Sequence, residues 1–276
     1  MDIQPIAFFE SPLKAKFGIP RQSGLVDELT GRIVFEHAFR KMEAVRGMED
    51  FDYLWLIWEF SGNHKAQSSN LKSQISNLKA QRSNLKSQNS NLKSQSSTLK
   101  AQSLTVRPPR LGGNKRIGVF ASRSPFRPNP LGLSCVRLDH VEEDPQLGPV
   151  IYVRGADLMD GTPIYDIKPY VVYADAHPDA RSGFVDEKKW EPLHVEIPDK
   201  LAVNIPAAHR EALRATLAQD PRPAFHDDPE RVYGMPFLNM DVRFCVKDGV
   251  LTVVDLAGAP EVVSRLADDD AIEEQQ

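Results

Sequence analysis

A strongly basic segment is the first part of this sequence whose residue types suggest chemistry. Between residues 107 and 130 the chain carries five Arg, one Lys and no acidic residue, and Gly112-Gly113 and the prolines at 125, 128 and 130 restrict the loops that hold them. Arginine outnumbers lysine, which favours bidentate contacts to phosphate or carboxylate groups. A basic loop that hydrogen-bonds its own neighbours explains the same residues equally well.

An acidic segment follows the basic one. Asp157, Asp160 and Asp166 lie within ten residues, beside a Gly-Thr-Pro turn. Carboxylates so placed can bind hydroxyl or cationic groups, or can accept a proton from a substrate. Because Asp before Gly is a common turn dipeptide, ordinary turn formation is the alternative. The two segments together predict a site for a molecule that carries both charges.

Motifs of several other enzyme classes are missing. The sequence contains no G-x-G-x-x-G, no P-loop, no H-E-x-x-H and no G-x-S-x-G. The sequence therefore does not indicate either of the standard nucleotide-binding folds, and it does not indicate a serine hydrolase. The seven His are scattered, and Cys135 and Cys245 stand far apart, so we expect no metal and no disulfide framework.

Closely spaced strands must position these segments. Apolar or alternating runs predict strands at 53–60, 116–121, 131–141, 150–155 and 167–174, with Pro or Gly in every interval. Residues 53–60 are almost continuously apolar and predict a strand that is buried on both faces. No long amphipathic helix intervenes, so we expect a barrel or sandwich rather than a doubly wound βαβ sheet.

A second, smaller unit follows at 177–257. Residues 206–218 predict a helix that ends before the Pro-Arg-Pro sequence, with Leu213, Leu217 and Ala218 near one face. Residues 242–246 and 250–256 flank Asp248-Gly249, a strong hairpin signal. The acidic segment 258–276 predicts a disordered tail.

The net charge of −4 is the sum of two unlike parts. Residues 65–104 carry six Lys, one Arg and no acid, whereas the other 236 residues carry 27 basic and 38 acidic side chains. Leucine recurs there every seven residues, from Leu71 to Leu99, but the second core position of a heptad is polar in four cases of five. We therefore interpret 65–104 as a basic, low-complexity and disordered insertion, which leaves 1–64 and 105–176 as one β domain.

No part of the sequence predicts export or membrane insertion. The N-terminus lacks the basic and apolar regions of a signal peptide, and the longest apolar run is far shorter than the roughly 20 residues that span a bilayer. We expect a cytoplasmic protein without a membrane partner.

Several long motifs, in one order, resemble the TrmO (TsaA-like) family. The resemblance covers about residues 3–256, except the repeat. It rests on the segments 18–26, 52–60, 107–114, 118–132, 157–163 and 166–170, and on 219–225 and 233–234 towards the C-terminus.

The resemblance implies a fold and an activity. Members of that family are S-adenosylmethionine-dependent tRNA methyltransferases that act on N6 of threonylcarbamoyl-adenosine beside the anticodon. Their fold is a single-sheeted β-barrel, unlike the Rossmann methyltransferases, and they work as homodimers. For this chain it implies a mainly β (α+β) protein, with a barrel domain and a small α+β C-terminal domain.

The resemblance also implies roles for individual residues. Ser61 departs from the family, whose members commonly carry His there. Asp157, Asp160 and Asp166 are the candidates for a general base that takes the proton of the acceptor nitrogen. The expected tRNA-phosphate contacts are Arg107, Arg110, Lys115, Arg116 and Arg127. The expected contacts to the methyl donor are Pro20, Arg21, Gln22, Ser61, Gly62, Asn63, Arg123, Gly132, Leu133, Asp157, Leu158, Met159, Asp160 and Gly161.

Two other functions stay open on the same residues. One is a non-catalytic protein that binds RNA or S-adenosylmethionine, and the other is methylation of a different, small substrate. The intact Arg-rich and Asp-Gly-Thr-Pro segments favour the tRNA methyltransferase.

Overall fold

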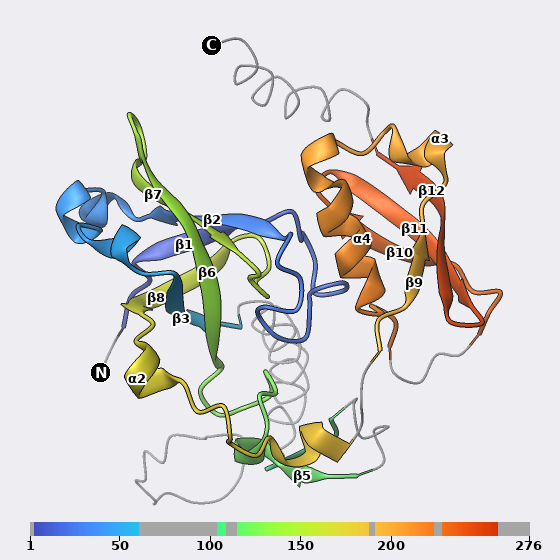
Figure 1. Cartoon of the computed structure of the whole chain (residues 1–276), viewed down its shortest axis with the longest axis horizontal. Coiled ribbons are helices and arrows are strands. Elements are labelled where there is room, and N and C mark those ends of the chain that lie inside the picture. Colours follow the sequence, from blue (N-terminus) through green and yellow to red (C-terminus); the bar gives the residue numbers. More distant parts are fainter. Residues whose placement is uncertain (1–2, 61–103, 109–114, 188–190, 224–227, 259–276) are drawn as a thin grey trace, which may run out of the picture.

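Two β units make up the protein in a computed structural model of the chain (Figure 1). The structure describes residues 3–60, 104–108, 115–187, 191–223 and 228–258. The predicted insertion, except Leu104, and the predicted tail, except Gly258, lie outside these residues. Among the described residues, no helix is long and apolar enough to cross a membrane.

The first unit is a closed, six-stranded antiparallel barrel. Its strands follow one another around the barrel in the order β1-β2-β7-β6-β3-β8, and β8 pairs with β1 to close it. The fold is therefore mainly β and single-sheeted, as predicted, and the closure excludes a sandwich. The strands are β1 (Ala7–Glu10), β2 (Thr30–Phe35), β3 (Tyr53–Glu59), β6 (Leu131–Asp144), β7 (Gly148–Arg154) and β8 (Thr162–Pro169).

Strand β3 shows how the barrel uses an apolar sequence. Leu54, Leu56 and Trp58 are buried in the barrel core, whereas the alternate side chains face outward and are only half-buried or exposed. Burial on both faces was a wrong prediction, because the wall of a closed barrel has one interior face. The outward Trp55 packs instead against Tyr170, with 6.0 Å between ring centroids.

Two other predicted strands are shorter or shifted. Residues 116–121 form only β5 (Ile117–Gly118), which pairs with β4 (Thr105–Val106), and then a 3-10 turn, η6 (Val119–Ala121). The strand predicted at 167–174 is β8, which ends at Pro169 before a helical turn, α2 (Val172–Asp175). Both apolar runs continue past the last residue that pairs with another strand, which is Gly118 in the first and Pro169 in the second.

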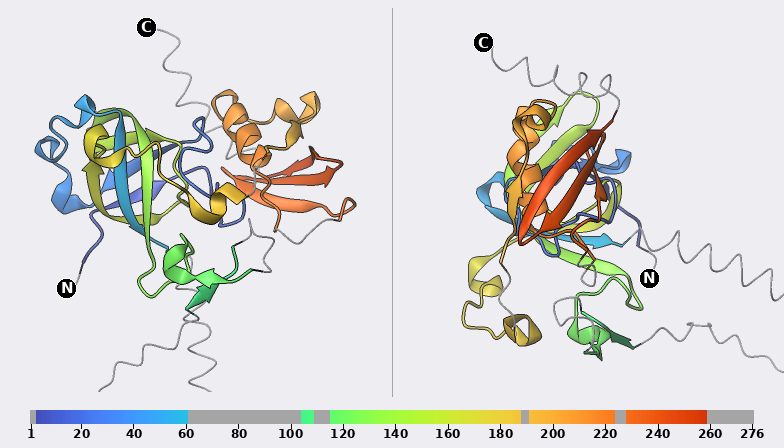
Figure 2. Two further views of the ribbon diagram at one scale, coloured as in Figure 1. Left: turned by 60° about the horizontal axis from the view of Figure 1, so that its bottom comes forward. Right: turned by 90° about the vertical axis from the view of Figure 1, so that its right-hand side faces the viewer.

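The second unit is a four-stranded sheet with a helix on one face (Figure 2). The predicted hairpin is present, and Asp248 and Gly249 both have positive φ values, of 50° and 78°. The predicted helix is a 3-10 turn, η8 (Ala207–His209), followed by α4 (Arg210–Ala218). The other elements are β9 (His194–Glu196), α3 (Asp199–Ala202), β10 (Tyr233–Phe237), β11 (Met240–Lys247) and β12 (Val250–Ala257).

The N-terminal loop between β1 and β2 joins the two units. Leu13, Val26 and Leu29 are buried in the same apolar cluster as Met235 and Phe237 of β10. The amide of Leu238 also donates to the Pro12 carbonyl at 2.7 Å. The C-terminal unit therefore holds in place the loop that carries residues 20–22.

An arm projects from the barrel below the N-terminal loop (Figures 1 and 2). It consists of the described residues 104–108 and 115–121, which include β4, β5 and η6. The segment that leads from the barrel to the C-terminal unit passes beside it and forms the 3-10 helix η7 (Gly183–Glu187). Lys115 of the arm and Glu187 of η7 form an ion pair of 3.2 Å.

Candidate active site

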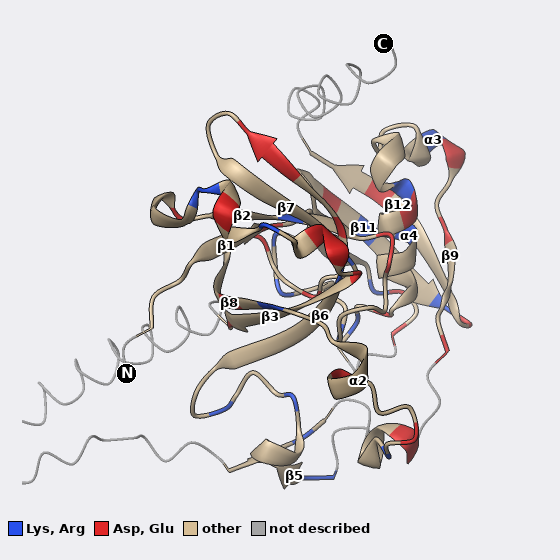
Figure 3. Ribbon diagram, turned by 60° about the vertical axis from the view of Figure 1, so that its left-hand side comes forward, with Lys and Arg blue, Asp and Glu red and all other residues tan. Residues whose placement is uncertain are grey.

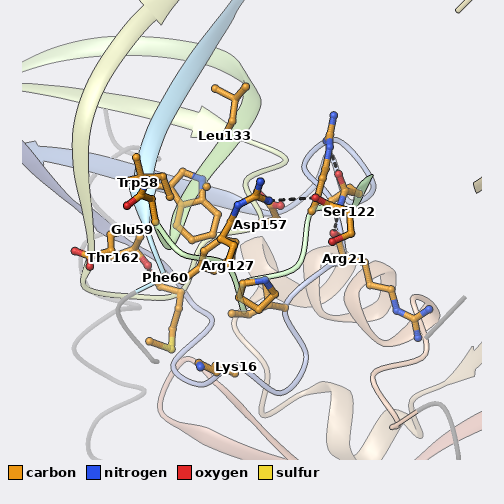
Figure 4. A pocket seen from close by; sticks show the side chains of 18 of the residues that line it. Lys16, Arg21, Trp58, Glu59, Phe60, Ser122, Arg127, Leu133, Asp157 and Thr162 are labelled. Carbon is orange, nitrogen blue, oxygen red and sulfur yellow. Dashed lines mark hydrogen bonds between the residues drawn. The ribbon is translucent and has the colours of Figure 1, made fainter. Parts of the chain in front are cut away.

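A cavity of about 720 Å³ opens at one end of the barrel (Figure 4). Trp58, Glu59 and Phe60 line one side of it, and Arg21 and Ser122 lie on the opposite side. The volume is typical of a site for a small molecule. Eight residues that were predicted to bind the donor line this cavity: Pro20, Arg21, Gln22, Arg123, Gly132, Leu133, Asp157 and Met159.

Three other predicted residues do not line the cavity. The side chain of Leu158 is fully buried in the barrel core. Asp160 turns the other way, where it pairs with Lys14 at 3.0 Å and accepts from the Ser11 amide at 2.9 Å. Gly161 forms the turn with a positive φ of 72°. The predicted donor contacts Ser61, Gly62 and Asn63 lie outside the described residues.

Asp157 is the carboxylate at the centre of the site. The Ser134 hydroxyl donates to it at 2.5 Å, and the Trp58 indole N–H donates to Ser134 at 2.9 Å. Burial raises the pKa of the Asp157 carboxyl, while the Ser134 hydrogen bond and the nearby Arg123 charge act in the opposite direction. The chain thus holds a basic carboxylate in a fixed position within the cavity.

The other two acidic candidates are placed differently. Asp166 lies on the wall of the barrel, pairs with Lys168 at 2.9 Å and does not line the cavity. Asp160 is held in the turn described above. Of the three predicted bases, the structure therefore brings only Asp157 to the cavity.

The cavity also has a cationic side. Arg123 donates to the Gln22 side chain, which fixes the N-terminal loop against the loop at 122–129. Arg127 donates to the Ser122 carbonyl at 3.1 Å and reaches the same cavity. Arg21 and Lys16 also line the cavity. Guanidinium and ammonium groups so placed can bind a carboxylate of a ligand.

Sequence reasoning missed the aromatic and acidic end of β3. Trp58 and Phe60 both line the cavity and pack edge to face, with 4.4 Å between their ring centroids. Glu59 accepts a hydrogen bond from Tyr165 at 2.5 Å, and burial together with this carboxylate raises the pKa of Tyr165 to about 12. Three consecutive residues face the cavity because β3 ends there, which the apolar run itself does not reveal.

The predicted phosphate contacts fall into two groups. Arg127 lines the cavity itself. Arg107, Lys115 and Arg116 lie on the arm, where Arg116 donates to the Thr105 hydroxyl at 3.1 Å and Lys115 pairs with Glu187. Figure 3 shows Lys and Arg residues in blue on the arm beside β5. Arg110 lies outside the described residues. Within the described part of the chain, no three His, Cys, Asp or Glu side chains form a metal-ligand cluster, and the absence of a metal stays a prediction.

Comparison with known proteins gives consistent matches along the chain. The family model of the tRNA-methyltransferase O N-terminal domain matches residues 8–90 and 86–176, and that of the TrmO C-terminal domain matches residues 191–259. The tRNA (adenine(37)-N6)-methyltransferase of Eikenella corrodens is 47% identical over 149 residues, which are 54% of this chain and 83% of that protein.

Longer matches cover both units. The Escherichia coli K12 protein of the same name is 32% identical over 263 residues, which are 92% of this chain and 96% of that protein. A crystal structure of TrmO from Pseudomonas aeruginosa has a TM-score of 0.66 and 30% sequence identity, and the match covers 94% of this chain and 97% of that one.

Proposed function

The chain belongs to the tRNA-methyltransferase O family, and we propose on this premise that it methylates N6 of adenosine 37 of tRNA with S-adenosylmethionine as methyl donor. Two other relatives are named for dependence on, or binding of, S-adenosylmethionine. The finer parts of the proposal are an acceptor that carries a threonylcarbamoyl group, a homodimeric enzyme and a cytoplasmic location.

The domain organisation belongs to the same proposal. We take 1–64 and 105–176 as the methyltransferase domain, 65–104 as an insertion, 177–257 as the C-terminal domain and 258–276 as a tail. In support, all six barrel strands lie between Ala7 and Pro169, and the four-stranded sheet lies between His194 and Ala257.

The residues of the cavity fit the chemistry of the donor. S-Adenosylmethionine carries a carboxylate, an ammonium group, ribose hydroxyls and a sulfonium whose methyl group is electrophilic. Arg21, Arg123 and Lys16 offer cations for the carboxylate, and Asp157 offers a carboxylate for a hydroxyl or cation. Trp58 and Phe60 offer aromatic surface for the adenine.

Asp157 is the general base in this proposal. The acceptor nitrogen bears a proton and is a poor nucleophile until that proton leaves. Methyl transfer forms an N–C bond as the S–C bond breaks, and the N6 proton passes to an oxygen of Asp157, directly or through one water. A carboxyl with a raised pKa is the better base, and Ser134 holds it in one orientation, which serves the alignment that methyl transfer needs.

Mass spectrometry of tRNA nucleosides tests the function directly. The purified protein is incubated with S-adenosylmethionine and a tRNA that carries threonylcarbamoyl-adenosine at position 37. We expect an N6-methylated product, and its absence with the correct tRNA present would leave a protein that only binds RNA or the donor. Calorimetry with S-adenosylmethionine then separates these two remaining functions.

Three matched variants test the base. We expect Asp157→Asn to lose turnover with tRNA binding intact, whereas Asp160→Asn and Asp166→Asn keep turnover, because neither side chain reaches the cavity. If Asp157→Asn loses only donor affinity and turns over normally at saturating donor, the residue binds the donor and is not the base. Three fully active variants would exclude a carboxylate base at these positions.

A further inference from the structure

A second, larger cavity of about 1480 Å³ lies between the arm and the segment that leads to the C-terminal unit. Thr105, Arg107 and Arg116 line it from the arm. Arg181 and Phe184 line it from the other side, at the start of η7. Neither Arg181 nor Phe184 has a role in the site described above.

The two cavities are neighbours with a shared wall. Arg21, Gln22, Phe120, Ser122, Arg123, Pro125 and Arg127 line both of them. A strand bound in the larger cavity therefore lies next to the cavity that Asp157 lines. No residue of the barrel core lines the larger cavity.

The charge of the larger cavity is entirely positive. Its lining contains six arginines, at 21, 107, 116, 123, 127 and 181, and no Asp or Glu. Within the described residues, none of these six forms an ion pair with a carboxylate. Six arginines elsewhere do so: Arg32, Arg137, Arg154, Arg214, Arg222 and Arg243. This difference indicates a polyanionic ligand that arrives from outside.

Two aromatic rings in the same lining are largely exposed to solvent. Phe120 is 73% exposed and Phe126 is 70% exposed. Their backbone is held in place, because the Ser122 hydroxyl donates to the Val119 carbonyl at 2.8 Å and the Phe126 amide donates to the Ser124 hydroxyl at 3.2 Å. Exposed, positioned rings among arginines without a carboxylate partner in the described residues are the combination that binds single-stranded nucleic acid, by base stacking and phosphate contacts.

We propose that this cavity binds the single-stranded nucleotides that flank the target adenosine. Bases stack on Phe120 and Phe126, and phosphates lie against Arg107, Arg116 and Arg181. The inference rests on the proposed function for the identity of the RNA, and it adds a stacking platform and a contribution from the linker segment.

Binding of a fluorescent anticodon stem-loop RNA to the full chain, without donor, tests the stacking. We expect Phe120→Ala and Phe126→Ala each to weaken the Kd by about 5-fold or more, with an unchanged salt dependence, since stacking contributes without charge. Phe120→Trp and Phe126→Trp should keep the affinity. The control is Phe39→Ala, which removes a ring that is 43% exposed but lines neither cavity.

The arginines are tested by the slope of log Kd against log salt. Arg116→Ala and Arg181→Ala should each reduce that slope by about 0.7, the loss expected for one phosphate contact on a single strand. Arg243→Ala, whose guanidinium is paired with Asp241 and Asp255, is the control and should leave the slope unchanged.

The outcomes separate this inference from the proposed function. If the wild type methylates tRNA but the Phe and Arg variants bind RNA like the wild type, the inference is wrong and the function stands. If the wild type does not methylate, yet its RNA binding depends on Phe120, Phe126 and Arg181, the cavity stands and the function is wrong. Failure of the wild type to bind the stem-loop at low salt would overturn the inference.

Discussion

Gly132 provides the sharpest test of how the site is built. It faces Trp58 in the pairing of β3 with β6. A Cβ added there would lie 2.3 Å from Cε2 and 2.5 Å from Cζ2 of the indole. Ordinary contacts begin at 3.4 Å, so in Gly132→Ala the ring must retreat by about 1 Å in a close-packed wall. The close approach of Trp58 thus explains why glycine stands at this position.

The expected loss of stability follows from the burial and the hydrogen bonds of the Trp58 ring. Trp58 is buried and its N–H donates to Ser134, which in turn holds Asp157. Overpacking of this kind costs about 1–3 kcal/mol of unfolding free energy. Each kcal/mol lowers the melting temperature by about 2–4 °C in a chain of this length. We expect a weaker donor affinity as well, because the displaced indole lines the cavity.

Thermal unfolding and donor calorimetry measure both effects. The control is Gly118→Ala, where an added Cβ meets nothing within 4 Å and φ is an ordinary −61°. A double-mutant cycle with Trp58→Leu, which removes Cε2 and Cζ2, should reduce the cost of Gly132→Ala. An equal cost in both backgrounds, or an alanine variant that behaves like the wild type, would refute the steric explanation.

Three further predictions concern the surrounding residues. Ser134→Ala removes a hydrogen bond that lowers the pKa of Asp157, so the carboxyl pKa rises and the acidic limb of the kcat/KM profile moves to higher pH. Thr216→Val, a buried hydroxyl in α4, is the control, and an unmoved limb would show that another group titrates. Asp160→Asn weakens the half-exposed pair with Lys14 and should lower the free energy of unfolding by about 1 kcal/mol or less in a denaturant titration; a loss of donor affinity instead would place Asp160 in the site. Deletion of residues 66–103 should leave the melting temperature unchanged, because every barrel strand pair forms between other residues, and a loss of soluble protein would contradict this.

Local sequence patterns predicted the elements well where neighbouring residues decide them. The Asp248-Gly249 turn produces its hairpin because these residues accept positive φ. The alternating run at 131–141 lies within β6, and the closely spaced strands indicated a barrel or sandwich. For the run at 53–60, the prediction of burial on both faces was wrong, because apolar side chains on the outer wall of a barrel are buried only where another element packs on them.

By itself, the sequence identified the segments that meet at the cavity. The Arg-rich loop, the N-terminal Pro-Arg-Gln and the Asp-rich turn are all found there. It did not determine which side chain of each segment faces inward. Asp157 and Met159 line the cavity while Leu158 enters the core, because the direction of each side chain depends on how the turn leaves the barrel wall.

Only the tertiary structure joined residues without a shared motif. Trp58, Ser134 and Asp157 come from three segments and form one hydrogen-bonded chain because β3 and β6 pair in a particular register. Arg181 and Phe184 reach the arm only because the linker passes beside it. Residue types and spacing determine which chemistry is present, whereas strand register and the path of the chain decide which groups come within reach of one another.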